Sequence, residues 1–221
     1  MTYEDLYRSG GFGYEQDRAK WVKWVKRHYV GEFELLRTTR RPRPTSVKSA
    51  LVEVPIRLRA MIRPRPRPKP TLLDIPCGDG FWTSVFRDLG FDAMGIDRSR
   101  AGIEHAKLTY PGIEFAVGNA EKALPVDGAH FDVVFSRGIT HLHFDDLERP
   151  ETHAMARNLI RYVGPGGQLL VSYYSKRDGG GTERHHYHQL WELVRLFESV
   201  GEIRRVDVVQ NFVQISVEPR G

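Results

Sequence analysis

The sequence lacks cysteine pairs, long apolar runs and an apolar N-terminus, and each absence argues against one class of protein. Cys77 is the only cysteine among 221 residues, so no disulfide can form within the chain. No run of about 18 apolar residues occurs, and we therefore expect no membrane-spanning helix. The first residues, MTYEDLYRSGG, are polar and acidic rather than typical of a signal peptide. These features predict a globular, cytoplasmic protein.

Positive charge is concentrated in the first third of the chain. Residues 1–70 hold 17 Lys and Arg against 7 Asp and Glu, a net charge of +10, whereas residues 71–221 have a net charge of −5. The stretches RTTRRPRP and RPRPRPKP place proline at alternate positions, which prevents both helix formation and strand pairing. We therefore expect extended, polyproline-like segments within residues 37–70.

Three roles are open for the basic segment 37–70. It could bind nucleic acid through phosphates, contact an anionic partner or substrate, or be an insertion with no role of its own. The segment has no aromatic residue that could stack on a base, which argues against specific recognition of single strands. We divide the chain into residues 1–70, an N-terminal helix with this basic insertion, and residues 71–221, a larger domain.

From residue 71 onward, short apolar runs alternate with amphipathic stretches. The runs predict strands over residues 71–75, 92–97, 113–117, 131–136, 168–174, 203–208 and 211–217. Helical spacing predicts helices over residues 14–30, 80–89, 100–108, 151–162 and 185–200. Strands that alternate with helices predict an α/β fold with a doubly wound, mostly parallel sheet.

Three local details accompany these helices. Ser99 is expected to cap the helix over 100–108, and the Trp residues of 14–30 are interpreted as packing groups. His185 and His188 are placed at a solvated helix start rather than in a metal site, because no matching acid or Cys motif accompanies them. The residues of 185–200 expected to face inward are Tyr187, Leu190, Trp191, Val194 and Phe197.

Polar residues and glycines follow the predicted strands where each strand ends, and ligands of such sheets bind at that edge. Gly78 and Gly80 would let a ligand approach the backbone closely. Asp97 ends the second strand, 17 residues beyond Gly80, where an acid can accept both hydroxyls of a ribose. Asn119 could bind a purine edge. The pattern therefore predicts a nucleoside-containing cofactor.

A nicotinamide dinucleotide fits this turn less well. Its glycines would follow the spacing G-x-G-x-x-G, whereas here Gly78 and Gly80 are followed by Thr83. Asp74 and Asp79 lie beside the turn and would repel a pyrophosphate. A nucleoside with a zwitterionic tail suits the turn better.

Four stretches in order resemble the class I S-adenosylmethionine-dependent methyltransferases: LLDIPCGDG, GIDRS, GNAEKALPVDGAHFDVVFSRG and LIRYVGPGGQLLVS. The resemblance covers about residues 71–217. It implies a Rossmann-like, seven-stranded sheet, mostly parallel with a reversed C-terminal hairpin and with helices on both faces. Two departures are Pro76, where a glycine is usual, and Asn119, where Asp is frequent. The implied cofactor is S-adenosylmethionine, with S-adenosylhomocysteine as the product.

The resemblance and the strand ends together assign the candidate cofactor site. Its predicted residues are Asp74, Pro76, Cys77, Gly78, Gly80, Asp97, Arg98, Asn119, Ala120 and Ser136. Cys77 is interpreted as a packing residue next to the cofactor and not as a nucleophile.

The acceptor site is expected to combine the N-terminus with the loop after the fourth strand. YEDLYRSGGFGYE resembles a segment that covers the ligands in some small-molecule methyltransferases, so Tyr3, Tyr7, Phe12 and Tyr14 are candidates for a lid. A packed or frayed terminus is the alternative. Arg137 could hold an anionic acceptor or pair with Asp145 or Asp146.

Two histidines after the fourth strand are candidate general bases. His141 and His143 could take a proton from an acceptor hydroxyl near neutral pH, or they could simply form a polar wall. No metal ion is expected.

The sequence favours methyl transfer to an oxygen or nitrogen of a small molecule. The alternative is an RNA or DNA methyltransferase that holds nucleic acid with its basic N-terminal region. SRGITH after the fourth strand disfavours the enzymes that methylate exocyclic amines or cytosine carbon. A third hypothesis is a nucleoside-binding partner protein without catalysis. The acceptor and the oligomeric state do not follow from the sequence.

Overall fold

A computed structural model provides the structure of the chain. It describes residues 3–9, 11–30, 68–126, 128, 130–144, 146–174, 180–182, 185–209 and 212–220. The roles considered for the basic segment 37–70 therefore concern residues that lie, except for 68–70, outside the described part. The fold below is built from the described residues.

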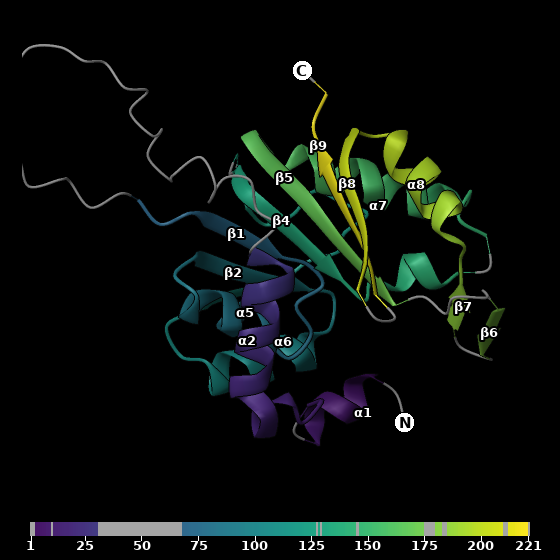
Figure 1. Cartoon of the computed structure of the whole chain (residues 1–221). Coiled ribbons are helices and arrows are strands. Elements are labelled where there is room, and N and C mark those ends of the chain that lie inside the picture. The colour runs from purple at the N-terminus through teal and green to yellow at the C-terminus, as the bar shows by residue number, and fades with distance from the viewer. Residues whose placement is uncertain are drawn as a thin grey trace, which may run out of the picture.

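Seven strands form one sheet in the order β3-β2-β1-β4-β5-β9-β8 (Figure 1). The strands are β1 (Thr71–Asp74), β2 (Asp92–Asp97), β3 (Glu114–Val117), β4 (Phe131–Arg137), β5 (Val163–Tyr174), β8 (Glu202–Val209) and β9 (Phe212–Glu218). The first five pair in parallel, and β9 runs antiparallel to both β5 and β8. The predicted doubly wound sheet with a reversed C-terminal hairpin is confirmed. Two short strands, β6 (Gly180–Thr182) and β7 (His185–Tyr187), pair separately.

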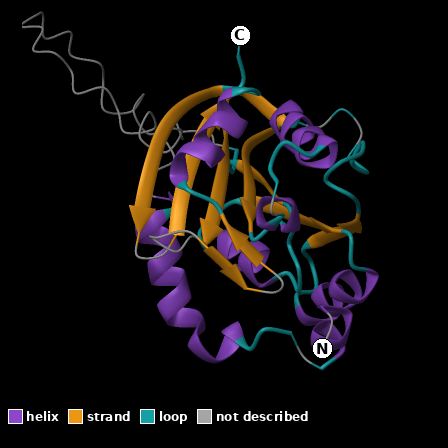
Figure 2. Cartoon of the chain, turned by 90° about the vertical axis from the view of Figure 1, so that its right-hand side faces the viewer, coloured by secondary structure: helices purple, strands orange, loops and turns teal. Residues whose placement is uncertain are grey.

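Helices cover both faces of the sheet (Figures 1 and 2). They are α1 (Tyr3–Arg8), α2 (Arg18–His28), α5 (Phe81–Asp88), α6 (Arg100–Thr109), α7 (Pro150–Arg161) and α8 (Leu190–Glu198), with 3-10 turns η1 (Tyr14–Asp17) and η3 (Thr140–His143). The predicted cap of α6 is confirmed, because the Ser99 hydroxyl oxygen accepts a hydrogen bond from the Gly102 amide at 3.0 Å. Within the described ranges, no helix has the length and apolar composition that crossing a bilayer would require.

Neighbouring residues along each central strand supply two separate cores. In β1, Leu72 packs with α2 and α5, while Leu73 packs with α7 and α8 on the opposite face. Val133 and Val134 divide in the same way along β4. Because side chains alternate between faces, strands buried on both sides are continuously apolar, as these are.

Helix α2 is part of the core and not an appendage. Tyr29, directly after it, is fully buried, and its ring centroid lies 5.0 Å from that of Phe135 in β4. Its hydroxyl lies 2.7 Å from the Ser172 hydroxyl oxygen in β5. Trp21 and Trp24 pack against other aromatic rings, as expected from their spacing. The N-terminal segment is therefore held against the same end of the sheet as the glycine turn.

The predicted helix over 185–200 is wrong at its start. Residues 185–187 form β7, and α8 begins at Leu190 with a reciprocal cap between Gln189 and Glu192. The inward position of Phe197 is confirmed, and Leu193 and Leu196 are buried beside it. Leu190 and Trp191, which were also expected to face inward, are exposed, Trp191 to 61%. The predicted helix began too early because residues 185–187 pair with β6 as a strand. The cap between Gln189 and Glu192 then fixes the start of α8 and the face of the helix that is buried.

His188 is also corrected by the structure. It was expected at a solvated helix end, but it is buried and its Nε2 lies 2.6 Å from the carbonyl oxygen of Phe144. This contact joins the segment before α8 to the end of η3.

Candidate active site

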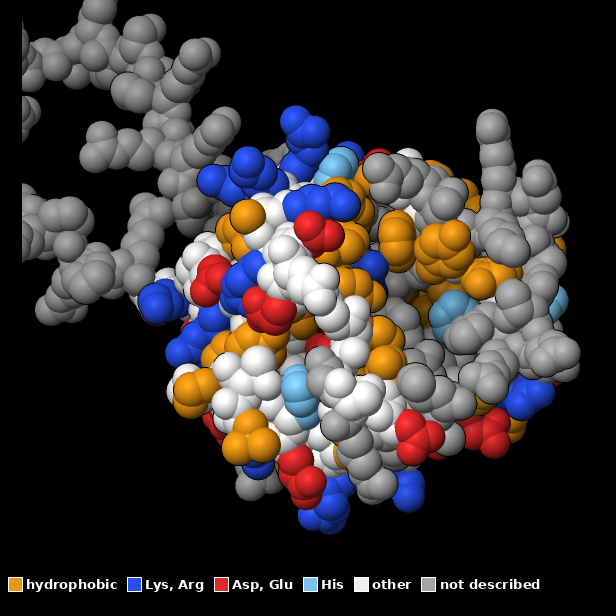
Figure 3. Space-filling view, turned by 90° about the horizontal axis from the view of Figure 1, so that it is seen from below, with side chains coloured by type: hydrophobic (Ala, Val, Ile, Leu, Met, Phe, Trp, Pro, Cys, Tyr) orange, Lys and Arg blue, Asp and Glu red, His pale blue; other side chains and the backbone are white. Residues whose placement is uncertain are grey.

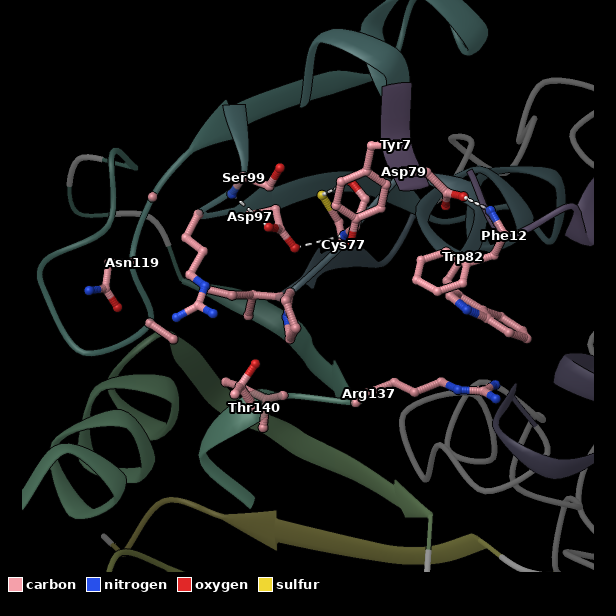
Figure 4. Close-up of a pocket in the computed structure, with 18 of the residues that line it drawn as sticks. Tyr7, Phe12, Cys77, Asp79, Trp82, Asp97, Ser99, Asn119, Arg137 and Thr140 are labelled. Carbon is pink, nitrogen blue, oxygen red and sulfur yellow. Dashed lines mark hydrogen bonds between the residues drawn. The ribbon is translucent and has the colours of Figure 1, made fainter. Parts of the chain in front are cut away.

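A pocket of about 630 Å³ lies at the carboxyl ends of β1, β2 and β4. On the face seen from below in Figure 3, hydrophobic side chains border a hollow in the surface. The pocket walls come from the turn after β1, the ends of the neighbouring strands and the N-terminal segment (Figure 4). Its volume lies in the range of small-molecule sites.

Most of the residues proposed from the sequence meet in this pocket. Those that line it are Tyr7, Phe12, Tyr14, Pro76, Cys77, Gly78, Asp97, Arg98, Asn119, Ala120, Arg137 and His141. Those that do not line it are Asp74, Gly80, Ser136 and His143. The side chain of Tyr3 lies outside the described part of the chain.

The two glycines of the turn serve different purposes. Gly78 has a φ of 57°, and a Cβ on it would lie 3.0 Å from the Tyr7 hydroxyl oxygen. Gly80 has a φ of 82°, and a Cβ there would lie 2.8 Å from the Ala106 Cβ and from the Phe115 ring. Gly78 therefore opens space inside the pocket, whereas Gly80 lets α5 approach α6 and β3 behind it. The Ile75–Pro76 peptide bond that precedes the turn is cis.

Asp97 is held in place by two backbone amides. Its Oδ2 accepts a hydrogen bond from the Gly78 N–H at 2.9 Å, and its Oδ1 accepts one from the Ser99 N–H at 2.8 Å. The side chain is 6% exposed and lines the pocket. Because an ionised carboxylate has about four acceptor positions, a carboxylate held in this way can still receive ligand hydroxyls. The geometry suits a ribose.

Asp79 joins the glycine turn to the N-terminal segment. Its Oδ2 accepts a hydrogen bond from the Phe12 N–H at 3.1 Å, and its Oδ1 accepts one from the Phe81 N–H at 3.2 Å. Phe12 is stacked on Tyr14 with a centroid distance of 5.6 Å and meets Tyr7 edge-on at 5.8 Å. The N-terminal aromatic residues thus form a wall of the pocket.

Arg137 ends β4 among aromatic rings. Its guanidinium carbon lies 4.1 Å from the Trp82 ring centroid and 4.6 Å from that of Phe212. Among the described residues, Nη1 is buried and has no hydrogen-bond partner. The pairing considered with Asp146 is not formed, since Asp146 Oδ1 accepts the Glu148 amide instead, and Asp145 lies outside the described residues.

His141 forms a close pair with Glu121. The distance from His141 Nε2 to Glu121 Oε1 is 2.7 Å, and the imidazole is almost fully buried. Its Nδ1 has no hydrogen-bond partner among the described residues. His143 lies away from the pocket, where its ring packs at 5.0 Å from Tyr173.

Asp74 lies beneath the pocket and not on its surface. It is 1% exposed and accepts a hydrogen bond of 2.6 Å from the Thr83 hydroxyl, which ties the end of β1 to α5. Burial, together with the nearby Asp97 and Asp79, raises the pKa of Asp74 to about 8, against the effect of the Thr83 bond. Asp74 is therefore mostly protonated at neutral pH.

Two further predicted residues are enclosed by the fold. Burial raises the pKa of the Cys77 thiol well above its ordinary value, so Cys77 is a neutral packing group. Ser136 is fully buried, and its hydroxyl has no hydrogen-bond partner among the described residues.

Sequence reasoning missed the roles of three residues at this site. Trp82 lies in the first turn of α5, and the start of a helix at the ligand edge is the signal that could have placed it there. Asp79, two residues before Phe81, has the spacing of an Asx turn. The contact of Glu121 with His141 has no local signal, because it joins two different loops. Within the described residues, no three His, Cys, Asp or Glu side chains group as metal ligands would.

Comparison with known proteins shows which protein family the chain matches. A family model described as a methyltransferase domain matches residues 48–210. The chain is 35% identical over 113 residues to the 2-methyl-6-phytyl-1,4-hydroquinone methyltransferase of Synechocystis sp., with 49% of this chain and 33% of that protein covered. It is 30% identical over 109 residues to the ubiquinone biosynthesis O-methyltransferase of Pelagibacter ubique, with 46% and 44% covered. The matched stretches thus span less than half of either relative.

A solved structure shows the same fold. The TehB-like SAM-dependent methyltransferase of Corynebacterium glutamicum superposes with a TM-score of 0.56 at 21% sequence identity, over 74% of this chain and 85% of that one.

Proposed function

The chain belongs to the family of S-adenosylmethionine-dependent methyltransferases, and on this basis we propose that it methylates an oxygen or a nitrogen of a small-molecule acceptor. When bound, S-adenosylmethionine supplies an electrophilic methyl group and leaves as S-adenosylhomocysteine. The observation that carries the proposal is the fixed Asp97 carboxylate, which lies beside an open glycine turn in a pocket with room for a small molecule.

The cofactor residues are proposed from their place in the pocket. Asp97 would receive the ribose hydroxyls, while Asn119 and Ala120 would contact the adenine edge and face. Gly78 would leave space for the methionine part. Asp74 and Gly80 would support this site from behind, because neither lines the pocket.

The N-terminal aromatic residues are proposed to enclose the acceptor. Tyr7, Phe12 and Tyr14 line the same pocket as Asp97, so a bound acceptor would lie between them and the strand ends. Holding the acceptor atom in line with the methyl group, away from water, would supply much of the rate acceleration. The names of the two relatives, a hydroquinone methyltransferase and an O-methyltransferase of ubiquinone biosynthesis, support a small-molecule acceptor.

His141 is the proposed general base for a hydroxyl acceptor. With Glu121 accepting the proton on Nε2, the imidazole would keep its basic lone pair on Nδ1, which is buried in this structure, so an acceptor hydroxyl would reach it only after a small movement of the ring or of the pocket wall. Glu121 would thereby orient the ring and stabilise it once it is protonated. His143 packs outside the pocket, and we assign it no step.

A nucleic-acid acceptor is the second candidate, and exposed cations on α2 favour it. Lys20, Lys23, Lys26 and Arg27 are exposed on this helix, in the basic third of the chain. Phosphate contacts would make binding fall steeply as salt rises. RNA or DNA affinity that stays constant from low to physiological salt would reject this candidate.

Calorimetry with three ligands tests the proposed function. We expect the protein to bind S-adenosylmethionine and S-adenosylhomocysteine, and to bind NAD far more weakly, because the Asp79 carboxylate at the turn disfavours a pyrophosphate, although the buried and mostly protonated Asp74 does not contribute to this repulsion as expected from the sequence. Binding of NAD alone would overturn the assignment of the cofactor.

A further inference from the structure

Arg137 is a cation of the pocket wall that forms no ion pair with an acid of the described part of the chain. We propose that Arg137 binds an anionic group of the methyl acceptor, a carboxylate or a phosphate carried on an apolar body. This inference rests on the proposed function, since it assigns the acceptor class of the same pocket. It is argued from the surroundings of Arg137, from the engagement of the nearby acids and from the position of Arg137 relative to Asp97.

Aromatic rings surround the guanidinium and limit how it can bind. The guanidinium carbon lies 4.1 Å from the Trp82 ring centroid, 4.6 Å from that of Phe212 and 5.9 Å from that of Trp24. Aromatic faces stabilise the cation, but they accept no strong hydrogen bond from it. The N–H groups around its edge that are not directed at the Tyr29 hydroxyl are therefore the ones available for a ligand. A fork of this kind matches the paired oxygens of a carboxylate or phosphate.

The acids that line the pocket are already engaged elsewhere. Asp97 accepts the amides of Gly78 and Ser99, and Asp79 accepts those of Phe12 and Phe81. Arg137 makes no ion pair with any acid of the described part of the chain, and its buried Nη1 has no hydrogen-bond partner there. The guanidinium as a whole is half-buried and lines the pocket, so its other N–H groups are the ones that a ligand oxygen would reach.

Two polar groups interact with Arg137, and burial raises the pKa of both, which favours their uncharged forms. Asp74 interacts with Arg137, but burial raises the pKa of this carboxyl to about 8, so it is mostly protonated. Burial also raises the pKa of the Tyr29 hydroxyl, despite the opposing effect of Arg137. Neither group supplies the missing negative charge.

Arg137 belongs to the acceptor end of the pocket. Its side chain extends away from Asn119 and Asp97, which are assigned to the cofactor, and lies under Trp82 (Figure 4). Trp82 lines the pocket together with Phe12 and Tyr14, whose rings lie close to one another. An acceptor there would meet one cation and several aromatic surfaces, which is the environment of an aromatic or otherwise apolar acid.

Three matched probes test the inference on protein saturated with S-adenosylhomocysteine. Calorimetry would compare benzoate and phenyl phosphate with benzamide, which has the same ring but no charge. We expect at least one anion to bind about tenfold more tightly than benzamide, and the tighter of the two identifies the anionic group. In Arg137→Met this preference should fall to within about twofold. Arg137→Lys keeps the positive charge but loses the paired N–H groups of the guanidinium, so it should retain part of the preference.

Arg149→Met is the matched control, because Arg149 also stacks on an aromatic ring, at 4.7 Å from the Phe144 centroid, but outside the pocket. It should bind the probes as the wild type does. An absence of any anion preference in the wild type, including no measurable binding of all three probes, would overturn the inference.

Arg137 could instead bind the carboxylate of the cofactor, and a second comparison separates the two sources. If Arg137→Met weakens S-adenosylhomocysteine but not 5′-methylthioadenosine, which lacks the amino-acid part, the acceptor assignment is overturned. If the wild type does not bind S-adenosylhomocysteine at all, the proposed methyltransferase function is overturned, and this outcome is distinct from a failure of the Arg137 inference alone. Unchanged S-adenosylhomocysteine affinity in Arg137→Met also shows that the variant is folded.

Discussion

The carboxylate of Asp79 accepts a hydrogen bond from the backbone N–H of Phe12, a residue 67 positions earlier in the chain. This bond connects the glycine turn to the N-terminal segment, so the two walls of the pocket are positioned together. It also makes the enclosure of the pocket depend on one buried side chain.

Replacing Asp79 should therefore loosen the N-terminal wall. In Asp79→Ala, the Phe12 and Phe81 amides lose their acceptor, and the loss of a buried partner costs about 1–3 kcal/mol. Hydrogen exchange of residues 11–14 should accelerate about tenfold or more, since each 1.4 kcal/mol is a factor of ten. Exchange rates equal to those of the exposed control Asp92→Ala would contradict the proposed connection.

Asp97→Ala should lower the affinity for S-adenosylhomocysteine. The variant loses the proposed ribose contact and releases the Gly78 and Ser99 amides, so we expect an increase in Kd of about tenfold or more. Asp92 lies at the opposite end of the same strand and pairs with Arg87 at the surface, which makes Asp92→Ala the matched control. Calorimetry on both variants gives the comparison, and equal affinities would reject the role of Asp97.

The buried carboxyl of Asp74 should make stability depend on pH. Its pKa is raised from 3.8 to about 8, so the folded state keeps a proton that the unfolded state loses above pH 4. The free energy of unfolding should then fall as pH rises from about 4 to 8, by up to roughly 1.4 kcal/mol per pH unit. Asp74→Asn should remove this slope in urea unfolding measured across the range. Parallel curves for variant and wild type would show that Asp74 does not titrate in this way.

His141→Gln should slow methylation of a hydroxyl acceptor. Loss of a general base lowers kcat by roughly 10²- to 10⁴-fold, and Glu121→Gln should have a smaller effect, because it removes only the group that orients the ring. The pair of His153 and Glu148, 3.2 Å apart at the surface, offers the control His153→Gln. The measurement is kcat against pH for all three variants. If His141→Gln kept the wild-type rate and profile, positioning alone would account for catalysis.

Gly80→Ala should destabilise the fold more than an alanine at another left-handed glycine. Gly80 and Gly112 have φ values of 82° and 87°, but only at Gly80 would a Cβ meet neighbours, at 2.8 Å from Ala106 and Phe115. Backbone strain costs about 1–2 kcal/mol at either site, and overpacking adds roughly 1–3 kcal/mol at Gly80. Urea unfolding of the two variants measures the difference. Equal losses of stability would mean that α6 and β3 move aside without cost.

Local patterns predicted the sheet and the edge of the sheet at which the pocket lies, because both depend on short-range periodicity. The alternation of apolar runs located the strands, and the placement of Gly78 and Asp97 at strand ends indicated a shared crevice. The start of α8 was harder to predict, because the spacing of apolar residues in 185–189 is compatible with either a helix or a short strand. There the pairing of β7 with β6 decided the outcome.

The sequence by itself determined the fold class, the ranges of the strands that end at the pocket and the family, since these follow from apolar periodicity and from motifs read along the chain. Only the tertiary structure decided which acids face the pocket. It buried Asp74 against Thr83, left Asp97 at the surface of the pocket and joined Asp79 to Phe12. It also placed Arg137 among aromatic rings from α2, α5 and β9. Such contacts join segments far apart in the chain, so their distances and burial have no counterpart in local sequence spacing.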